Sequence, residues 1–272
     1  MRRLFLCLIL PLLISLGDTP AFGAAWLVPQ GDTKLLINRL QETAPNLNPN
    51  GGPIVHLGAA RKELNKVHIE YGVHDAITLD AIAEHAQDHL GSDKNSATFM
   101  RVGGRIRARH LETGLLPPYL YKGLQKLFPK TRSTRQKRAT IGLGLVGRQT
   151  DFNNRRGTAH GHHWHIALAD KVSLGPIYFL QTVENGKTEM SGIDWRHSLY
   201  RFEIGWRHGL AFGTQAQFFD DENTGFAALT HLHTASWSWP DKQIKLTGSY
   251  GSKRQTGFIK SDVVALELEV TF

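Results

Sequence analysis

The sequence contains a single cysteine among its 272 residues, and this residue, Cys7, lies in an apolar stretch near the start. If that stretch is a leader that is removed, the remaining chain has no thiol. Disulfide bonds, thiolate metal ligands and thiol nucleophiles are then excluded. The sequence after this stretch also lacks an apolar run of about 18 residues, which excludes a further transmembrane helix.

Motifs for phosphate binding and for paired-carboxylate catalysis are absent from the sequence. The glycine-rich stretch Ile141–Gly147 alternates glycine with apolar residues and does not have P-loop spacing. No low-complexity linker divides the chain, and no internal repeat is visible beyond a hairpin unit. We therefore expect no cofactor and a single domain over residues 25–272.

Residues 1–24 have the pattern of a secretory signal peptide. Arg2 and Arg3 form a positively charged start, and Leu4–Leu16 form an apolar core of 13 residues. Small residues follow near position 23, as signal peptidase requires. The core is too short to span a bilayer. The chain is therefore predicted to be exported, and nucleic acid is not an expected partner.

The rest of the sequence is dominated by apolar and polar residues that alternate with a period of two. In Val67–Val73 the odd-numbered residues are apolar and the even-numbered ones are not. A second alternating run begins at Ala76, after His74 and Asp75, so the two runs are predicted to form a hairpin. In all, the pattern predicts 12 strands, at about residues 33–40, 62–73, 76–86, 98–110, 138–149, 159–169, 174–184, 197–206, 209–219, 226–237, 242–252 and 261–272.

Strands of about ten residues with weak but repeated alternation are typical of transmembrane β-barrels. Aromatic residues near the strand ends, such as Tyr200, Trp206 and Trp237, favour a barrel with two membrane interfaces over the alternative, a secreted β-sandwich. The predicted fold class is all-β: a 12-strand antiparallel up-and-down transmembrane β-barrel.

The predicted connections alternate between short turns and longer polar loops. This contrast indicates periplasmic turns at one end and outer loops at the other, and an even strand count returns both termini to one side. The longer loops are predicted at 41–61, 87–97, 150–158, 185–196, 220–225 and 253–260.

Residues 113–138 interrupt this pattern at a place where a short turn is expected. Tyr119, Leu120, Leu124 and Leu127 have helical spacing, which predicts a short amphipathic helix in a periplasmic insertion. The basic run at 130–138 is either a solvated loop or a site for anionic lipid headgroups or polysaccharide.

The last nine residues, VALELEVTF, alternate strictly and end in Phe272. They resemble the C-terminal signature of Gram-negative outer-membrane β-barrel proteins, which the barrel-assembly machinery reads. The stretches A25-W-L-V-P-Q-G-D32 and Y71-G-V-H-D-A-I-T-L79 are also similar to a set of uncharacterised proteobacterial barrels. Those begin with Ala-Trp, a Pro and a Gly, and carry a YG-x-x-D-x-x-T-L hairpin.

The resemblance implies a location in a bacterial outer membrane and no catalytic residues. Outer-membrane lipid, lipopolysaccharide and the barrel-assembly machinery are the partners it implies. In such a barrel the last strand pairs with the first, because an open edge in lipid leaves backbone groups unsatisfied. The ring of Phe272 would then lie at the edge of the apolar band.

If the apolar side of each strand faces lipid, the opposite sides line the lumen. One predicted strand then carries a ladder of four positive charges: Arg101, Arg105, Arg107 and Arg109. Such ladders select anions in pores. Asp80 and Glu84 on the neighbouring strand give the alternative, a structural lattice of salt bridges. The predicted function is a passive, porin-like channel for small solutes, anions among them, with the four arginines setting its selectivity and Asp80 and Glu84 beside them in the lumen.

Two histidine patterns leave other functions open. His163 and His165 share one face of a strand and could coordinate a metal ion with a third ligand; histidines of a wet lumen or rim are the alternative. His231 and His233 precede Ser236 on one strand and offer Ser–His chemistry. The sequence predicts no enzyme, with an outer-membrane lipid- or envelope-modifying hydrolase and a closed structural or binding barrel as alternatives.

Overall fold

The computed structural model describes residues 25–44, 60–90, 93–127, 133–152, 155–191, 193–206, 209–221, 223, 226–255 and 260–272. The predicted signal peptide, residues 1–24, lies outside the described residues. The strands are β1 (Thr33–Ala44), β2 (Ala60–His74), β3 (Ile77–Leu90), β4 (Asp93–Arg107), β5 (Ser133–Phe152), β6 (Arg155–Leu174), β7 (Ile177–Met190), β8 (Ile193–Trp206), β9 (Leu210–Asp221), β10 (Phe226–Trp239), β11 (Ile244–Gln255) and β12 (Ser261–Thr271).

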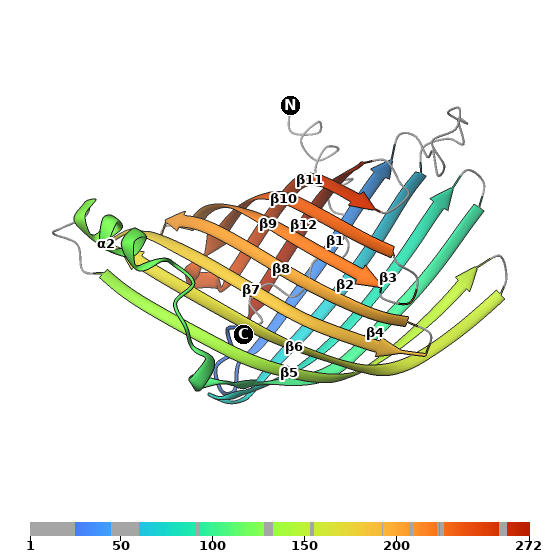
Figure 1. Ribbon diagram of the computed structural model, residues 1–272, viewed down its shortest axis with the longest axis horizontal. Coiled ribbons are helices and arrows are strands. Elements are labelled where there is room, and N and C mark those ends of the chain that lie inside the picture. The colour runs from blue at the N-terminus through green and yellow to red at the C-terminus, as the bar shows by residue number, and fades with distance from the viewer. Residues whose placement is uncertain are drawn as a thin grey trace.

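These strands form one closed barrel in which each strand pairs with its neighbours in sequence (Figure 1). All pairs are antiparallel, and β1 pairs with β12 from Lys34 opposite Thr271 to Thr43 opposite Asp262. The predicted fold class and the count of 12 strands are confirmed.

Residues Thr33 and Phe272 extend the seam between the first and last strands. The backbone N–H of each donates a hydrogen bond to the carbonyl oxygen of the other, at 2.7 and 2.9 Å. Phe272 is 67% exposed. Closure leaves no strand edge whose backbone groups would lack partners in lipid.

The two faces of the barrel wall differ in chemistry. Large apolar side chains point outward and stay exposed, such as Val102 at 64% and Leu145 at 74%. Charged and polar side chains point inward and are buried, such as Glu70, Arg105 and Glu203. A water-soluble protein has the opposite arrangement. The exterior is therefore suited to hydrocarbon and the interior to polar groups, as in a transmembrane barrel.

Thr33 at the start of β1 and Phe272 after β12 lie at one end of the barrel, which we call the terminal end; the other is the loop end. Trp206 and Trp237 point outward near the terminal ends of β8 and β10, and Trp239 follows at the end of β10. Tyr200 and Tyr250 point outward closer to the loop end, each six residues from the terminal end of its strand. Rings at two levels match the two interfaces that the sequence predicts.

The prediction of long loops is wrong for three connections at the loop end. Only residues 91–92, 153–154 and 191–192 separate the strands there. The polar residues continue the strand ladders, so β5 and β6 reach 20 residues each. Backbone pairing does not require apolar side chains, and strands can therefore run past the apolar band. Residues 108–132, at the terminal end, form a longer connection.

This connection contains a short 3-10 helix, η1 (Arg109–Leu111), and an α-helix, α2 (Pro118–Leu127). The helix that the leucine and tyrosine spacing predicts is thus present, and Figure 1 shows it beside the start of β5. Strand β5 begins at Ser133, five residues earlier than predicted. No helix among the described residues is long and apolar enough to cross a membrane.

The connection packs on the outside of the barrel. Leu116 lies against Val172 and Leu174 on the outward side of β6. The carboxylate of Asp170 accepts hydrogen bonds from the backbone N–H of Leu116 at 3.0 Å and from the Arg135 guanidinium at 2.5 Å. A buried ion pair and an apolar contact therefore fix the connection to β5 and β6.

Candidate functional site

The candidate site is a network of charged side chains inside the barrel. It surrounds a part of the wall where two inward-facing positions of β5 are glycines. Strand β5 presents Gly142 and Gly144 inward. A Cβ on Gly142 would collide with the imidazole of His165, and one on Gly144 would lie 3.4 Å from Cγ of Arg101. The two glycines leave room for side chains of β4 and β6 to meet across β5.

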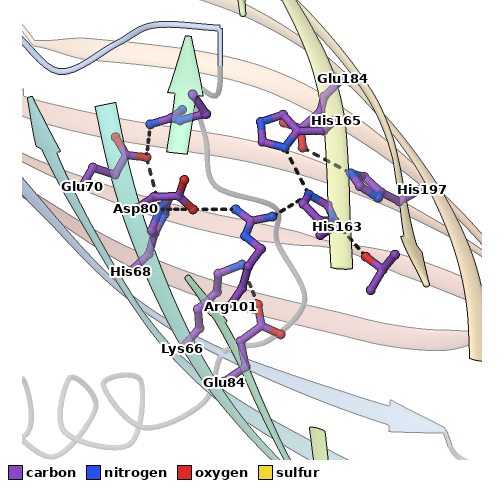
Figure 2. A network of polar contacts seen from close by, with 12 residues as sticks. Lys66, His68, Glu70, Asp80, Glu84, Arg101, His163, His165, Glu184 and His197 are labelled. Atoms are coloured by element: carbon purple, nitrogen blue, oxygen red, sulfur yellow. Dashed lines mark hydrogen bonds and ion pairs between the residues drawn. The ribbon is translucent and has the colours of Figure 1, made fainter. Parts of the chain in front are cut away.

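Arg101 is the centre of this network. Its Nη2 donates a hydrogen bond to Oδ2 of Asp80 at 3.1 Å, and its Nη1 donates to Nε2 of His163 at 2.8 Å. Figure 2 shows Arg101 between the acidic groups of β2 and β3 and the histidines of β6 and β8. One guanidinium therefore links β3, β4 and β6.

The hydrogen bonds of His163 determine which ring nitrogen carries its proton. A guanidinium can only donate, so Nε2 of His163 accepts from Arg101. Nδ1 then carries the proton and donates to Oγ1 of Thr188, 2.8 Å away. The Nδ1 of His165 lies 3.1 Å from the same Nε2. His163 is therefore neutral in this arrangement.

A third imidazole completes the histidine group. The ring of His197 stacks on that of His163, with centroids 5.4 Å apart, and its Nε2 lies 3.3 Å from Oε1 of Glu184. Even so, no group of three or more His, Cys, Asp or Glu side chains within the described ranges is placed to hold a metal ion. The pair His163 and His165 thus gains no third ligand from this part of the chain.

On β2 and β3, acids and bases are also matched. Nζ of Lys66 lies 2.7 Å from Oε1 of Glu84. Nη2 of Arg105 lies 2.9 Å from Oε1 of Glu70, and Nε2 of His68 lies 3.3 Å from the same oxygen. Glu84, predicted to face the arginines, is therefore paired with a lysine.

The opposite wall carries a second group of charges around Glu203. Its carboxylate pairs with Arg201 and with Nζ of Lys245 at 3.3 Å, and it accepts a hydrogen bond from the Tyr178 hydroxyl at 2.7 Å. Lys34 and Glu269 pair at 3.1 Å nearby on β1 and β12. The lumen is lined by a lattice of ion pairs on both sides.

Three of the four predicted selectivity arginines lie on β4, and each has an acidic partner. Arg101 and Arg105 face the lumen, while Arg107 pairs with Glu112 at 2.7 Å at the terminal end. The placement of Arg109 on this strand was wrong. Strand β4 ends at Arg107 because the chain turns away into η1, which leaves Arg109 exposed and off the barrel wall.

The alternative of Ser–His chemistry between Ser236 and His231 or His233 does not fit the structure. Successive side chains of a strand point to opposite faces, so residues an odd number of positions apart cannot meet. Both histidines are exposed on the outer face, whereas Ser236 is buried on the inner face. His231 instead lies 2.9 Å from the hydroxyl of Thr214, also on the outside.

Sequence reasoning missed two parts of the interior. Glu184, Thr188 and His197 were not predicted as partners of the histidines, although the alternation along β7 and β8 places all three inward. Residues Ala25–Asp32 were also missed: they fold into the lumen, where the backbone N–H of Val28 donates to Oγ1 of Thr78 at 3.0 Å. No regular alternation marks this segment.

Comparison with known proteins places the fold. No protein-family model matches the sequence, and no curated protein sequence matches it. An outer membrane channel from Pseudomonas putida F1 has a similar structure, with a TM-score of 0.59 and 10% identity over 94% of this chain and 100% of that chain. The chain has the fold of an outer-membrane β-barrel. This fold and the apolar exterior agree with the predicted location in a bacterial outer membrane.

Two further structures give lower scores. The translocator domain of the autotransporter NalP from Neisseria meningitidis has a TM-score of 0.47 and 10% identity, over 90% of each chain. The KdgM porin has a TM-score of 0.46 and 8% identity, over 87% of this chain and 99% of that chain. Identities this low bear on fold alone.

Proposed function

We propose that the chain is an outer-membrane channel for small solutes that prefers anions, with Arg105 and Arg101 as the residues that meet the solute. Twelve strands enclose a wider interior than the packed core of an eight-strand barrel. The interior carries many charged side chains, together with a buried apolar cluster of Leu40, Leu232, Val263 and Ala265. A polar path across an apolar band is what a solute channel requires.

The observation that carries the anion preference is the state of Arg105. Its side chain is 1% exposed, and its Nε and Nη1 donate to no acceptor among the described residues. Only Nη2 has a partner, the carboxylate of Glu70. A guanidinium presents paired N–H groups that can form a bidentate hydrogen bond with a carboxylate or a phosphate. Arg105 therefore has donors to offer an entering anion.

The lattice of ion pairs gives this preference a mechanism. Free positive charges would hold an anion tightly, whereas a paired arginine can exchange its carboxylate partner for that of a solute. Arg101, bound to Asp80, and Arg105, bound to Glu70, are four residues or about 13 Å apart along β4 and provide two such steps. A solute would pass by successive exchange, which combines entry with release.

The test is the reversal potential of the purified protein in a planar bilayer under a KCl gradient. We expect preference for chloride over potassium in the native chain and a several-fold lower chloride-to-potassium ratio in Arg105→Gln. The control is Arg109→Gln, which removes an exposed arginine outside the wall and should leave the ratio unchanged. A cation-selective native channel would contradict the proposal.

A closed structural barrel is the second candidate, and one observation favours it. Inward-facing side chains such as His68, Glu70 and Glu203 are each at most 2% exposed, so the wall is covered in the described state. Such a barrel would give no unit conductance in any of the variants described below, although it would still show heat-dependent gel mobility.

We also propose that Phe272 is the residue that the barrel-assembly machinery reads. Its exposed ring at the end of the closing strand supports this role. Phe272→Ala should lower the amount of heat-modifiable barrel in the outer-membrane fraction several-fold, whereas Phe218→Ala, an outward aromatic away from the seam, should have a smaller effect. Equal amounts of both variants would contradict the role. Outer-membrane lipid and lipopolysaccharide stay predicted partners.

A further inference from the structure

Residues Ala25–Asp32 enter the barrel through the terminal end instead of following its outer surface. A tight turn starts this path: the backbone N–H of Asp32 donates to the carbonyl of Pro29 at 3.1 Å, and Gly31 between them has a φ of +88°, which favours glycine. The N–H of Gly31 donates to the carbonyl of Gly72 at 2.8 Å, and the N–H of Gly72 donates to that of Asp32 at 3.0 Å. The turn is thus paired with the end of β2.

Gly72 and Thr78 form one half of the seat for this segment. A Cβ at Gly72 would overlap the carbonyl group of Pro29, so only glycine permits this close approach. Thr78, fully buried on the inward side of β3, accepts the hydrogen bond from the backbone N–H of Val28. Val28 itself is 3% exposed.

The other half of the seat lies on β5, β6 and β7. Ala25 is fully buried against Ala167 and Ala169, two small inward-facing residues of β6. Trp26 packs on the same cluster, and the guanidinium of Arg138 lies over its ring at 5.5 Å from the centroid. The segment therefore reaches from β2 and β3 to the strands on the far side of β4.

The seat also adjoins the proposed anion site. Thr78 lies opposite Arg105 in the pairing of β3 with β4. Asp80, which forms the ion pair with Arg101, lies two residues further along β3. A solute that leaves Arg105 toward the terminal end therefore meets Val28 and Trp26. The segment occupies the way out below the two arginines.

We propose that Ala25–Asp32 is an N-terminal plug that closes the terminal end of the barrel and has to leave its seat for a solute to pass. This inference rests on the proposed channel function. Among the described residues, the plug is joined covalently to the wall only through β1, and beyond the turn these residues give it one hydrogen bond, one cation–π contact and an apolar contact with Ala167, Ala169 and Leu180. Such a segment can swing out about the turn while the barrel stays closed.

The test uses a disulfide between Val28→Cys and Thr78→Cys. Cys7, the only native cysteine, lies in the predicted leader. We expect the pair to cross-link in the native membrane under mild oxidation. The control pair is Val28→Cys with Gln215→Cys, which faces inward on β9, six strands from β3 in the ring of twelve, and should not cross-link.

Conductance then shows whether the seated plug closes the path. The oxidised Val28–Thr78 pair should conduct at least fivefold less than the same protein after dithiothreitol. Trp26→Ala, which weakens the seat without a cross-link, should raise the open probability at least threefold. Trp164→Ala, the same substitution on the lipid-facing side of β6, should leave it unchanged.

The outcomes separate the two proposals. Absence of the Val28–Thr78 cross-link overturns the plug, whatever the conductance. A cross-link that forms without changing conductance overturns it too, and in both cases the channel function stands. If the cross-link forms and no form of the folded barrel conducts, including Trp26→Ala, the channel function fails and gating by the plug fails with it.

Discussion

Two parts of the lumen, the network around Arg101 and the N-terminal plug, are held by different chemistry. In the middle, Arg101 joins a carboxylate of β3 to an imidazole of β6 through charged hydrogen bonds. At the terminal end, the N-terminal plug rests on backbone hydrogen bonds and on small apolar residues. The first depends on charge and the second on shape.

This difference separates stability from access. The network side chains come from strands that cannot leave the wall, so breaking an ion pair leaves a buried charge behind and weakens the barrel. The plug belongs to no strand, so removing its contacts opens the terminal end and leaves the wall intact. Substitutions should therefore alter one property without the other.

The largest effect is expected for Arg105→Ala. Removing this guanidinium leaves the buried carboxylate of Glu70 with His68 as its close partner, and breaking a buried ion pair costs about 3–5 kcal/mol. Urea unfolding in lipid vesicles, followed by heat-dependent gel mobility, should show a lower midpoint. Arg109→Ala, at an exposed residue, is the control. Equal midpoints for both variants would mean that the network does not stabilise the wall.

Gly72→Ala acts on the N-terminal plug instead. Its new Cβ has to displace the carbonyl of Pro29, and strain of this kind costs about 1–3 kcal/mol. A thiol reagent should label Val28→Cys faster in this background, while the unfolding midpoint of the barrel stays close to native. Gly248→Ala places the same methyl group in open space on β11 and should not change the labelling rate. An unchanged rate in Gly72→Ala would show that the plug does not depend on this contact.

Arg101→Lys separates the effect of charge from that of geometry, because it keeps the positive charge and removes the planar guanidinium. An ammonium group cannot reproduce the two-sided contact with Asp80 and His163, and one charged hydrogen bond is worth about 1.5–3 kcal/mol. The unfolding midpoint should fall while the reversal potential stays close to native. Arg101→Gln should shift both quantities. If lysine also abolished the anion preference, geometry rather than charge would set the selectivity.

The smallest effect is expected for His163→Gln. A glutamine oxygen can still accept the hydrogen bond from Arg101, so the loss should be about 0.5–1 kcal/mol. His160→Gln, at an exposed residue of the same strand, should cost nothing measurable. A loss as large as that of Arg105→Ala would show that the histidine group, not the arginines, holds the network together.

The sequence predicts the wall of the barrel well because period two is a local property. The alternation in Val67–Val73 identifies the outward face of β2 without knowledge of any partner strand. The same rule places Arg101, Asp80 and His163 in the lumen. It could also have excluded the Ser236–His231 pair, since five positions separate those two residues and put them on opposite faces.

What the sequence does not reveal depends on contacts between distant segments. Charge pairing is an example: Arg101 reaches His163 only because Gly142 and Gly144 clear the strand between them. The strand ends are another, since polar residues near 150–158 look like a loop but continue the ladder between β5 and β6. In both cases a neighbouring strand, rather than the local pattern, decides the outcome.

The plug joins the two stretches that carry the resemblance to other small barrels. Pro29 and Gly31 come from the first stretch, and Gly72 and Thr78 from the YG-x-x-D-x-x-T-L hairpin. The sequence alone shows these as two separate motifs. In the folded chain each supplies half of one contact.

The unequal strand lengths make the rims of the barrel lopsided. Strands β5 and β6 have 20 residues, whereas β9 and β11 have 12, a difference of about 26 Å of extended chain. Strands β5 and β6 therefore extend beyond their neighbours, and α2 lies beside the terminal end of this pair. Each opening is therefore bordered by the longer strands on one side and by the shorter strands β9 to β11 on the other.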